Sequence, residues 1–176
     1  MGTPKALLEY RGETFLARLE RIIGNCCSPL IVVVGHERNL PIERGRVVIN
    51  PAPERGMLSS LQCGLAALGP LPEGVLFLPV DFPAVEENTV QQLVALFERS
   101  PAAAAAMPRD TGKRGHPVLM RRHVAEEILA LPADGEARNV IRAHNHEIVY
   151  AEVDDPGIHR DVDTPQDYQE LLKGNS

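Results

Sequence analysis

Between positions 75 and 81 the chain reads Val75-Leu76-Phe77-Leu78-Pro79-Val80-Asp81, an apolar run that ends in a carboxylate, with Pro83 just beyond it. A continuous apolar run bounded in this way is typical of a strand that is buried on both faces of a parallel sheet. We therefore predict a buried strand over 75–81 that carries Asp81 to the edge of the sheet.

Similar runs alternate with stretches of helical spacing on both sides of this segment. Further strands are predicted over 30–34, 46–50, 102–107, 117–120 and 146–153. Apolar residues recur at helical intervals over 15–23, 58–68, 90–97 and 124–131. A last helix is predicted after Thr164, a good N-cap residue, with Pro165 at its first position and Asp167 placed to close a capping box. The alternation predicts an α/β domain over residues 1–176, with a mainly parallel sheet covered by helices on both faces.

Composition and charge exclude several classes of protein. The chain has 18 basic and 24 acidic residues, a net charge of −6, so it lacks the basic surplus of a general nucleic-acid or membrane-surface binder. No apolar run approaches the roughly 18 residues of a membrane span, and the start has no basic-then-apolar signal pattern. Three cysteines, two of them adjacent, disfavour a disulfide scaffold or a zinc knuckle. We expect a reduced cytoplasmic domain with neither a nucleic-acid nor a membrane partner.

Two acidic positions are the main candidates for chemistry, because ligands of open α/β sheets bind beyond the carboxyl ends of the strands. Asp81 is either a turn former before Pro83 or a ligand of Mg²⁺, which takes one or two protein carboxylates. In an extended segment His159, Asp161 and Asp163 would share one face. Two carboxylates so close repel each other unless a cation lies between them. Asp81 and Asp161 together favour a two-carboxylate magnesium site over separate structural roles.

Other candidates have a plain structural alternative. Lys5 is either solvated or placed to neutralise charge on a triphosphate. The segment 56–61 is predicted to begin a helix. The N–H groups at the start of this helix either bind an anion or are capped by the side chain of Ser59. His116 either orients a substrate phosphate or is an ordinary loop residue. His144-Asn145-His146 has no partner at zinc spacing, which indicates a solvated loop.

Taken in order, these segments resemble the molybdenum-cofactor nucleotidyltransferases, the MobA-like family, and its cytidylyltransferase branch most of all. The resemblance rests on segments that follow the family's order along nearly the whole chain: Pro4–Leu8, Gly12–Leu16, Val34–His36, Asn50–Pro51, Gly56–Leu61, Leu78–Pro83, Gly115–Val118 and Asp161–Asp167. Each motif alone is weak, and their conserved order along the chain makes the match specific.

The resemblance implies a Rossmann-like three-layer nucleotidyltransferase fold, similar to glycosyltransferase A, with a mixed, mainly parallel sheet. It implies transfer of CMP from CTP to a molybdopterin-type phosphate with release of pyrophosphate, and a molybdoenzyme or chaperone as partner. The alternatives are a transferase that uses GTP or a sugar-phosphate acceptor, and a non-catalytic binding module. The implied roles are the triphosphate-binding lysine for Lys5 and magnesium ligation for Asp81 and Asp161. The implied binding residues are Asn50, Gly56, Ser59 and Ser60 for the nucleotide and Gly115, His116 and Pro117 for the acceptor.

The beginning of the chain departs from the family pattern. Members open with a strand and a glycine-rich loop of the form L-A-A-G-x-S-x-R-M-G-x-P-K, and Met1–Lys5 matches only the tail of that motif. The resemblance therefore implies a domain without its first strand, which is usually central in the sheet. The expected consequence is that backbone groups of the neighbouring strands are left unpaired.

Overall fold

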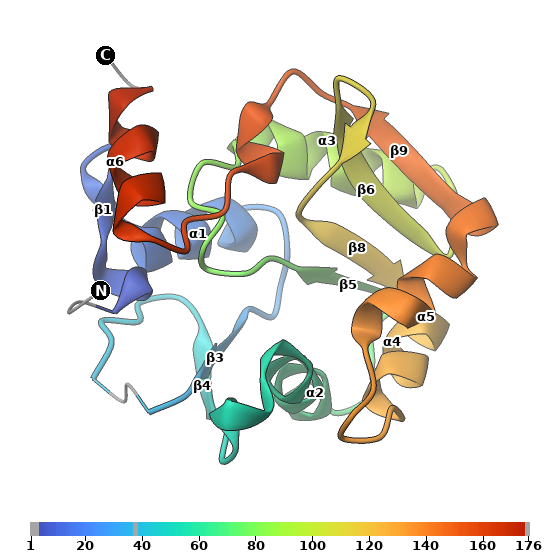
Figure 1. Cartoon of the computed structure of the whole chain (residues 1–176). Helices are drawn as coiled ribbons and strands as arrows, with labels where there is room; N and C mark the ends of the chain where they lie inside the picture. The colour runs from blue at the N-terminus through green and yellow to red at the C-terminus, as the bar shows by residue number, and fades with distance from the viewer. Residues whose placement is uncertain (1–3, 37–38, 175–176) are drawn as a thin grey trace.

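The computed structural model describes residues 4–36 and 39–174. Its helices and strands alternate along the chain (Figure 1). The strands are β1 (Glu9–Tyr10), β2 (Glu13–Thr14), β3 (Ile31–Val34), β4 (Arg46–Ile49), β5 (Gly74–Phe77), β6 (Ala105–Asp110), β7 (Lys113–Arg114), β8 (Val118–Arg121) and β9 (Ile148–Glu152). The helices are α1 (Phe15–Gly24), α2 (Met57–Ala67), α3 (Glu87–Glu98), α4 (Arg122–Leu129), α5 (Ala137–Ala143) and α6 (Pro165–Lys173). Short 3-10 helices cover Lys5–Leu7, Pro53–Arg55, Asn145–Glu147 and Pro156–His159.

The larger sheet is mixed, as predicted, but antiparallel pairing is commoner in it than the expected mainly parallel sheet implies: β5–β8, β6–β8 and β6–β7 are antiparallel, and β6–β9 is parallel. Strand β8 lies between β5 and β6 and is antiparallel to both, whereas β9 is parallel to β6 on its other side. It follows that β5, β6 and β9 point the same way and that β8 is reversed between them. Strands β3 and β4 form a separate parallel pair. The predicted α/β class with a mixed sheet is therefore confirmed.

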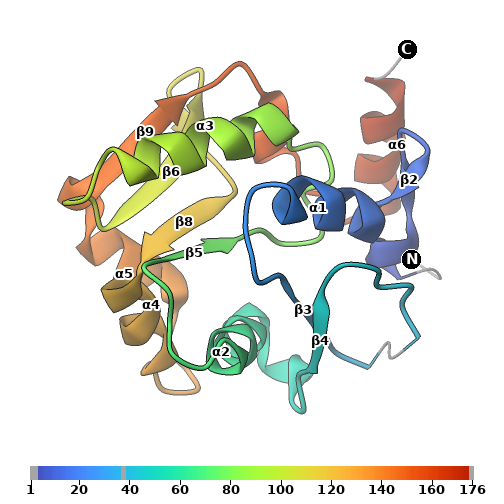
Figure 2. The same cartoon turned by 180° about the vertical axis from the view of Figure 1, so that it is seen from behind.

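Helices cover both faces of the larger sheet. Along β6, Ala105 and Met107 belong to one buried cluster and Ala106 to another, because successive side chains of a strand point to opposite faces. The first cluster includes residues of α2, α4 and α5, and the second includes Leu93 and Phe97 of α3. Figure 2 shows α3 in front of the sheet when the molecule is seen from behind. No helix in the described ranges is long and apolar enough to cross a membrane.

Several predicted boundaries were wrong for identifiable reasons. The strand expected over 75–81 ends at Phe77, which pairs with Val118 of β8. Beyond this pair each strand meets a proline, because Pro79 lies shortly after Phe77 and Pro117 lies directly before Val118. Proline has no N–H to donate to a sheet. The strand expected over 102–107 starts later, at Ala105, and continues to Asp110. Helix α5 was not predicted, since only Val140 of its seven residues is buried.

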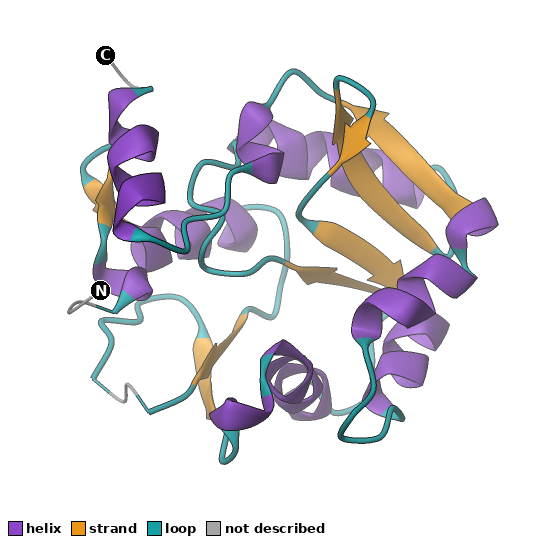
Figure 3. Ribbon diagram, viewed as in Figure 1, coloured by secondary structure: helices purple, strands orange, loops and turns teal. Residues whose placement is uncertain are grey.

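The sheet is interrupted between β3 and β5. In the described part of the chain, β3 pairs only with β4 and β5 only with β8, so each keeps one open edge. Figure 3 shows the β3–β4 pair apart from the larger group of strands. A cavity of about 380 Å³ lies here, lined mainly by apolar side chains of α1, α2, β3 and residues 74–80.

Candidate functional site

Asp81 lies in the loop that follows β5 and is largely shielded from solvent. Its Oδ1 atom is buried and has no hydrogen-bond partner among residues 4–36 and 39–174, and its Oδ2 atom lies 3.7 Å from Nζ of Lys5. Burial raises the pKa of the Asp81 carboxyl above its ordinary value; Lys5 opposes this rise, and the charges of Asp163 and Asp161 add to it. Asp81 is thus a half-buried carboxylate whose Oδ1 atom is available to a ligand.

A second acidic segment is attached directly to the first. The backbone N–H of Val162 donates a hydrogen bond of 2.9 Å to the carbonyl oxygen of Asp81. The Val162 side chain is fully buried in a cluster with Phe15 and Leu171. Asp161 and Asp163, on either side of Val162, are exposed. The structure therefore places the segment with Asp161 and Asp163 next to Asp81, and the charges of both aspartates act on its carboxyl. That Asp81 and Asp161 bind one metal ion stays a prediction.

His159 does not follow the predicted pattern. The expectation that His159, Asp161 and Asp163 share one face assumed an extended segment, but Pro156–His159 forms a 3-10 helix. His159 is partly buried, with its Nε2 atom lacking a hydrogen-bond partner, whereas the two aspartates are exposed. The helical turn changes the direction of His159 relative to the residues after it.

The ammonium group of Lys5 lies between the carboxylates of Asp81 and Asp163. Its Nζ atom donates to Oδ1 of Asp163 at 2.5 Å and lies near Asp81 as well. Lys5 begins the 3-10 helix Lys5–Leu7, so the start of the chain meets the loop after β5 and the segment before α6. Lys5 is therefore paired with two carboxylates rather than simply solvated, and its contact with a triphosphate stays a prediction.

The segment 115–117 is held against the same region. A Cβ atom on Gly115 would lie 2.2 Å from the carbonyl oxygen of Ile158, so only glycine fits there. The N–H of His116 donates to that same oxygen at 3.0 Å, and its ring packs on Phe82 with centroids 4.6 Å apart. The His116 Nδ1 atom is buried without a partner; burial lowers the pKa of His116, and the charge of Asp161 opposes that shift. Asp161 therefore acts electrostatically on both Asp81 and His116.

His116 also lines a cavity of about 500 Å³. The wall opposite the sheet is provided by α5 and the residues before it, and the floor includes apolar side chains such as Phe77 and Met107. Four arginines contribute to the lining: Arg55, Arg114, Arg138 and Arg142. Glu136 also lines the cavity and forms an ion pair with Arg138, so the cavity combines an apolar floor with a rim that is cationic on balance. Sequence reasoning singled out none of these arginines, and two of them, Arg138 and Arg142, lie on the unpredicted helix α5.

The predicted nucleotide-binding group has a structural role in this conformation. Asn50 is buried, and its amide nitrogen donates to the hydroxyls of Ser59 (2.8 Å) and Ser60 (3.0 Å), while its amide oxygen accepts from the N–H of Ala52. The Ser59 hydroxyl donates to the carbonyl of Gly56 at 2.9 Å. These side chains use up their hydrogen bonds in shaping the loop 50–56 rather than facing solvent.

The same loop leaves the beginning of α2 open. The N-cap is Gly56, not Ser59, and no side chain caps the helix. Gly56 has φ +83°, a conformation that favours glycine. The first N–H groups of the 11-residue helix are thus without a side-chain acceptor, which is the usual setting for an anion. This segment can therefore bind an anion through its backbone N–H groups rather than through side chains.

An α/β fold in which a lysine and several aspartates meet beyond the end of a sheet strand fits the class of nucleotidyltransferase domains. The chain belongs to the MobA-like NTP transferase family, because the model of the MobA-like NTP transferase domain matches residues 1–148. That match ends within β9, so the segment with Asp161 lies beyond it. No curated protein sequence matches the chain significantly.

Solved structures support the same fold. Rv0371c from Mycobacterium tuberculosis has 27% sequence identity and a TM-score of 0.80, covering 98% of this chain and 90% of its own. Its complex with manganese gives 25% identity and a TM-score of 0.77, covering 97% and 91%. The 2-C-methyl-D-erythritol 4-phosphate cytidylyltransferase from Thermus thermophilus is 17% identical with a TM-score of 0.72, covering 98% and 93%. Molybdopterin-guanine dinucleotide biosynthesis protein A from Archaeoglobus fulgidus is 14% identical with a TM-score of 0.66, covering 99% and 91%.

Proposed function

We propose that this nucleotidyltransferase transfers CMP from CTP to the phosphate of a molybdopterin-type acceptor and releases pyrophosphate. The observation that carries the proposal is the contact of Lys5 with Asp81 and Asp163, beside an Asp81 Oδ1 atom that is buried and has no hydrogen-bond partner among the described residues. Asp161 lies near enough for its charge to raise the pKa of Asp81. A buried carboxylate oxygen without a protein donor fits a bound cation, since buried polar groups otherwise find a hydrogen bond.

In the proposed reaction, an acceptor phosphate oxygen forms a bond to the α-phosphorus of the nucleotide. The bond from that phosphorus to the bridging oxygen of the β-phosphate breaks, and the electron pair leaves with pyrophosphate. Positioning and charge neutralisation account for most of the catalysis in phosphoryl transfer of this kind. Lys5 contacts the triphosphate, which requires its ammonium group to leave Asp163 in favour of the phosphates.

Asp81 and Asp161 would hold the divalent ion, for which we propose Mg²⁺. The donor set fits, because Mg²⁺ prefers carboxylate oxygens and binds to one or two of them while it keeps waters and substrate phosphates. When bound, the ion would offset the negative charge of the phosphates. A manganese complex of Rv0371c supports divalent-metal binding in a protein of this fold.

The nucleotide and acceptor would bind on opposite sides of this acidic centre. The open beginning of α2 after Gly56 provides N–H groups for the nucleotide, with Asn50, Ser59 and Ser60 holding the loop in shape. The cavity beside Gly115, His116 and Pro117 would receive the acceptor, its arginines facing the phosphate. CTP is our choice of donor; GTP is the alternative, and a cytidylyltransferase and a molybdopterin-guanine dinucleotide biosynthesis protein both share the fold.

We also propose the cytoplasm as the compartment. Cys26, Cys27 and Cys63 are free thiols, which suits a reducing environment. Burial raises the pKa of the Cys27 thiol to about 11, so this group stays protonated and unreactive at neutral pH.

The test is pyrophosphate release from each of the four common nucleoside triphosphates with Mg²⁺ and molybdopterin. We expect pyrophosphate to be released faster with CTP than with the other three nucleotides. The rate with CTP should fall at least about 100-fold in Asp81→Asn, which removes the negative charge of the side chain while keeping its shape. The matched control is Asp154→Asn at an exposed aspartate, which should keep full activity.

Each result of this assay has a defined meaning. Higher release with GTP would assign the alternative donor. Calorimetric binding of a nucleotide without any release of pyrophosphate would favour the non-catalytic binding module. Unchanged release by the folded Asp81→Asn variant would remove Asp81 from the mechanism.

A further inference from the structure

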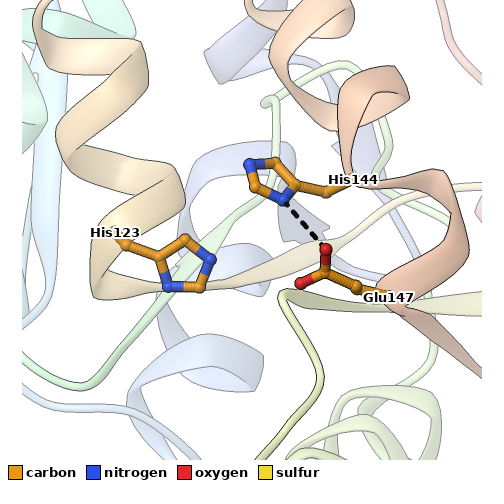
Figure 4. A group of neighbouring side chains, drawn as sticks. All are labelled: His123, His144 and Glu147. Atoms are coloured by element: carbon orange, nitrogen blue, oxygen red, sulfur yellow. Dashed lines mark ion pairs between the residues drawn. The ribbon is translucent and has the colours of Figure 1, made fainter.

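A cluster of histidine and glutamate side chains lies on the surface formed by α4 and the end of α5. His123 comes from α4, His144 follows the last residue of α5, and Glu147 ends the 3-10 helix Asn145–Glu147. One ligand atom from each of these residues lies within 4.8 Å of the others. Figure 4 shows the three side chains converging, with the ion pair between His144 and Glu147 dashed. The interpretation of 144–146 as a solvated loop without partners is therefore wrong for His144.

We propose that His123, His144 and Glu147 bind a transition-metal ion of the zinc type, with Glu127 as a positioning residue. Two imidazoles and one carboxylate are a common ligand set for zinc, which then takes water in the fourth position. Imidazole nitrogen also suits copper and nickel, whereas Mg²⁺ prefers oxygen ligands. The site therefore differs in chemistry from the carboxylate pair Asp81 and Asp161.

The spacing of the ligand atoms is close to what such an ion needs. With bonds of about 2.0–2.2 Å, ligand atoms around a tetrahedral ion lie roughly 3.3–3.6 Å apart. The observed limit of 4.8 Å leaves about 1.5 Å at most to close. His123 and Glu147 are exposed, so rotation of their side chains can close it without moving the backbone.

The two nitrogens of His144 face different carboxylates. Its Nδ1 atom lies 3.8 Å from Oε1 of Glu147, and its Nε2 atom lies 3.0 Å from Oε1 of Glu127. If Nδ1 binds the ion, Nε2 carries the proton and donates it to Glu127. A histidine ligand whose other nitrogen donates to a carboxylate is the usual arrangement in metal sites, because it holds the ring in one tautomer and orientation. His144 is also the least exposed of these side chains, at 17%.

The backbone beneath the cluster is well anchored. Val124 and Ile128 of α4 pack in the same buried cluster as Val140 of α5. The carbonyl of Glu147 accepts a hydrogen bond of 2.9 Å from the N–H of Ala104, just before β6. The ligands thus project from elements that the core already holds together, which lowers the ordering cost of binding an ion. An ion here would join α4 to α5, the helix that walls the arginine-lined cavity.

The test is titration of the purified chain with Zn²⁺ by calorimetry and with Co²⁺ by visible absorption. We expect one ion per chain at this site and the intense absorption of tetrahedral Co²⁺. His144→Ala and His123→Ala should each weaken binding at least about tenfold, and Glu127→Gln should weaken it by roughly 10-fold, the lower end of effects for groups that orient ligands. His146→Ala is the matched control, a histidine of the same loop outside the cluster, and should bind as the wild type does.

Binding in an Asp81→Asn background separates this site from the carboxylate pair. Retained Co²⁺ absorption there supports the proposal. Absence of tetrahedral absorption in the wild type, or equal affinity in His123→Ala, would overturn it. His123 is exposed, so its alanine variant keeps the fold and the comparison stays valid if His144→Ala does not. Zinc should also raise the melting temperature of the wild type and not that of His123→Ala.

Discussion

The N–H of Val162 donates a 2.9 Å hydrogen bond to the carbonyl oxygen of Asp81, and this contact joins the two acidic segments of the site. Val162 is fully buried, so its side chain holds the segment in place while the aspartates on either side remain exposed. An apolar residue between two acids thus determines where the acids lie.

Replacing Val162 with alanine should therefore affect both stability and activity. We expect Val162→Ala to lower the free energy of unfolding by about 2 kcal/mol, through lost burial and the cavity left behind. Pyrophosphate release should also fall, since Asp161 and Asp163 lose their anchor. Urea unfolding and the release assay measure the two effects, with Val47→Ala, at a half-exposed position of β4, as control. Full activity in a destabilised Val162→Ala would show that the segment needs no such anchor.

The pKa of Asp81 should respond to its charged neighbours in opposite directions. Lys5 stabilises the carboxylate, so Lys5→Met should raise the pKa of Asp81 further. Asp163 repels it and also engages Lys5, so Asp163→Asn should lower that pKa. Carboxyl ¹³C NMR titration of the wild type and both variants would measure these shifts. Equal values in all three would contradict the electrostatic account.

The raised pKa also has a consequence for stability. Because burial raises the pKa of Asp81 above 3.8, the native state binds this proton more tightly than the unfolded chain does. The contribution of Asp81 to stability is therefore greatest at low pH and falls as the pH rises from about 3.8 through the native pKa. Asp81→Asn lacks this loss, so at neutral pH it should melt no lower than the wild type. A clear drop in its melting temperature would contradict this.

Gly115 should not tolerate a side chain. A Cβ atom there would overlap the carbonyl of Ile158, which is backbone and cannot rotate away, so Gly115→Ala should cost about 3 kcal/mol. The matched control is Gly24→Ala, where the nearest atom to the added Cβ is 3.7 Å away in the Arg44 side chain. That change at the end of α1 should alter stability by less than about 1 kcal/mol. Thermal unfolding compares the two, and similar melting temperatures would refute the close contact.

Amide hydrogen exchange should reveal the interruption of the sheet. Strand β6 pairs with β8 and β9 on its two sides, whereas β3 and β5 each have one open edge at the apolar cavity. Amides of β3 and β5 should therefore exchange faster than those of β6 at neutral pH. Exchange measured by mass spectrometry or NMR tests this, and uniform protection across the three strands would show that the cavity is closed to water.

Local sequence signals predicted most elements well. Thr164 caps α6 through a full capping box with Asp167, as the residues Thr-Pro-Gln-Asp indicated. The branched run 30–34 forms a strand, because residues of this type favour the extended backbone wherever they are buried. The end of β5 was misplaced, since it depends on Pro117 of a partner strand distant in sequence. Helix α5 was not predicted, because its single buried residue, Val140, gives no helical repeat of apolar residues.

The same distinction between local sequence signals and contacts formed on folding applies to the candidate site. Sequence alone determined the class of fold and singled out Asp81, because hydrophobic periodicity and a carboxylate after an apolar run depend on near neighbours in the chain. Only the tertiary structure decided that Lys5 lies between Asp81 and Asp163. It also decided that the side-chain amide of Asn50 donates to two serine hydroxyls, and that each ring nitrogen of His144 faces a carboxylate. The contacts of Lys5 join segments 76 and 158 residues apart. Those of Asn50 and His144 span 3 to 17 residues and depend on how the loops fold against their helices. All of them exist only once the chain has packed.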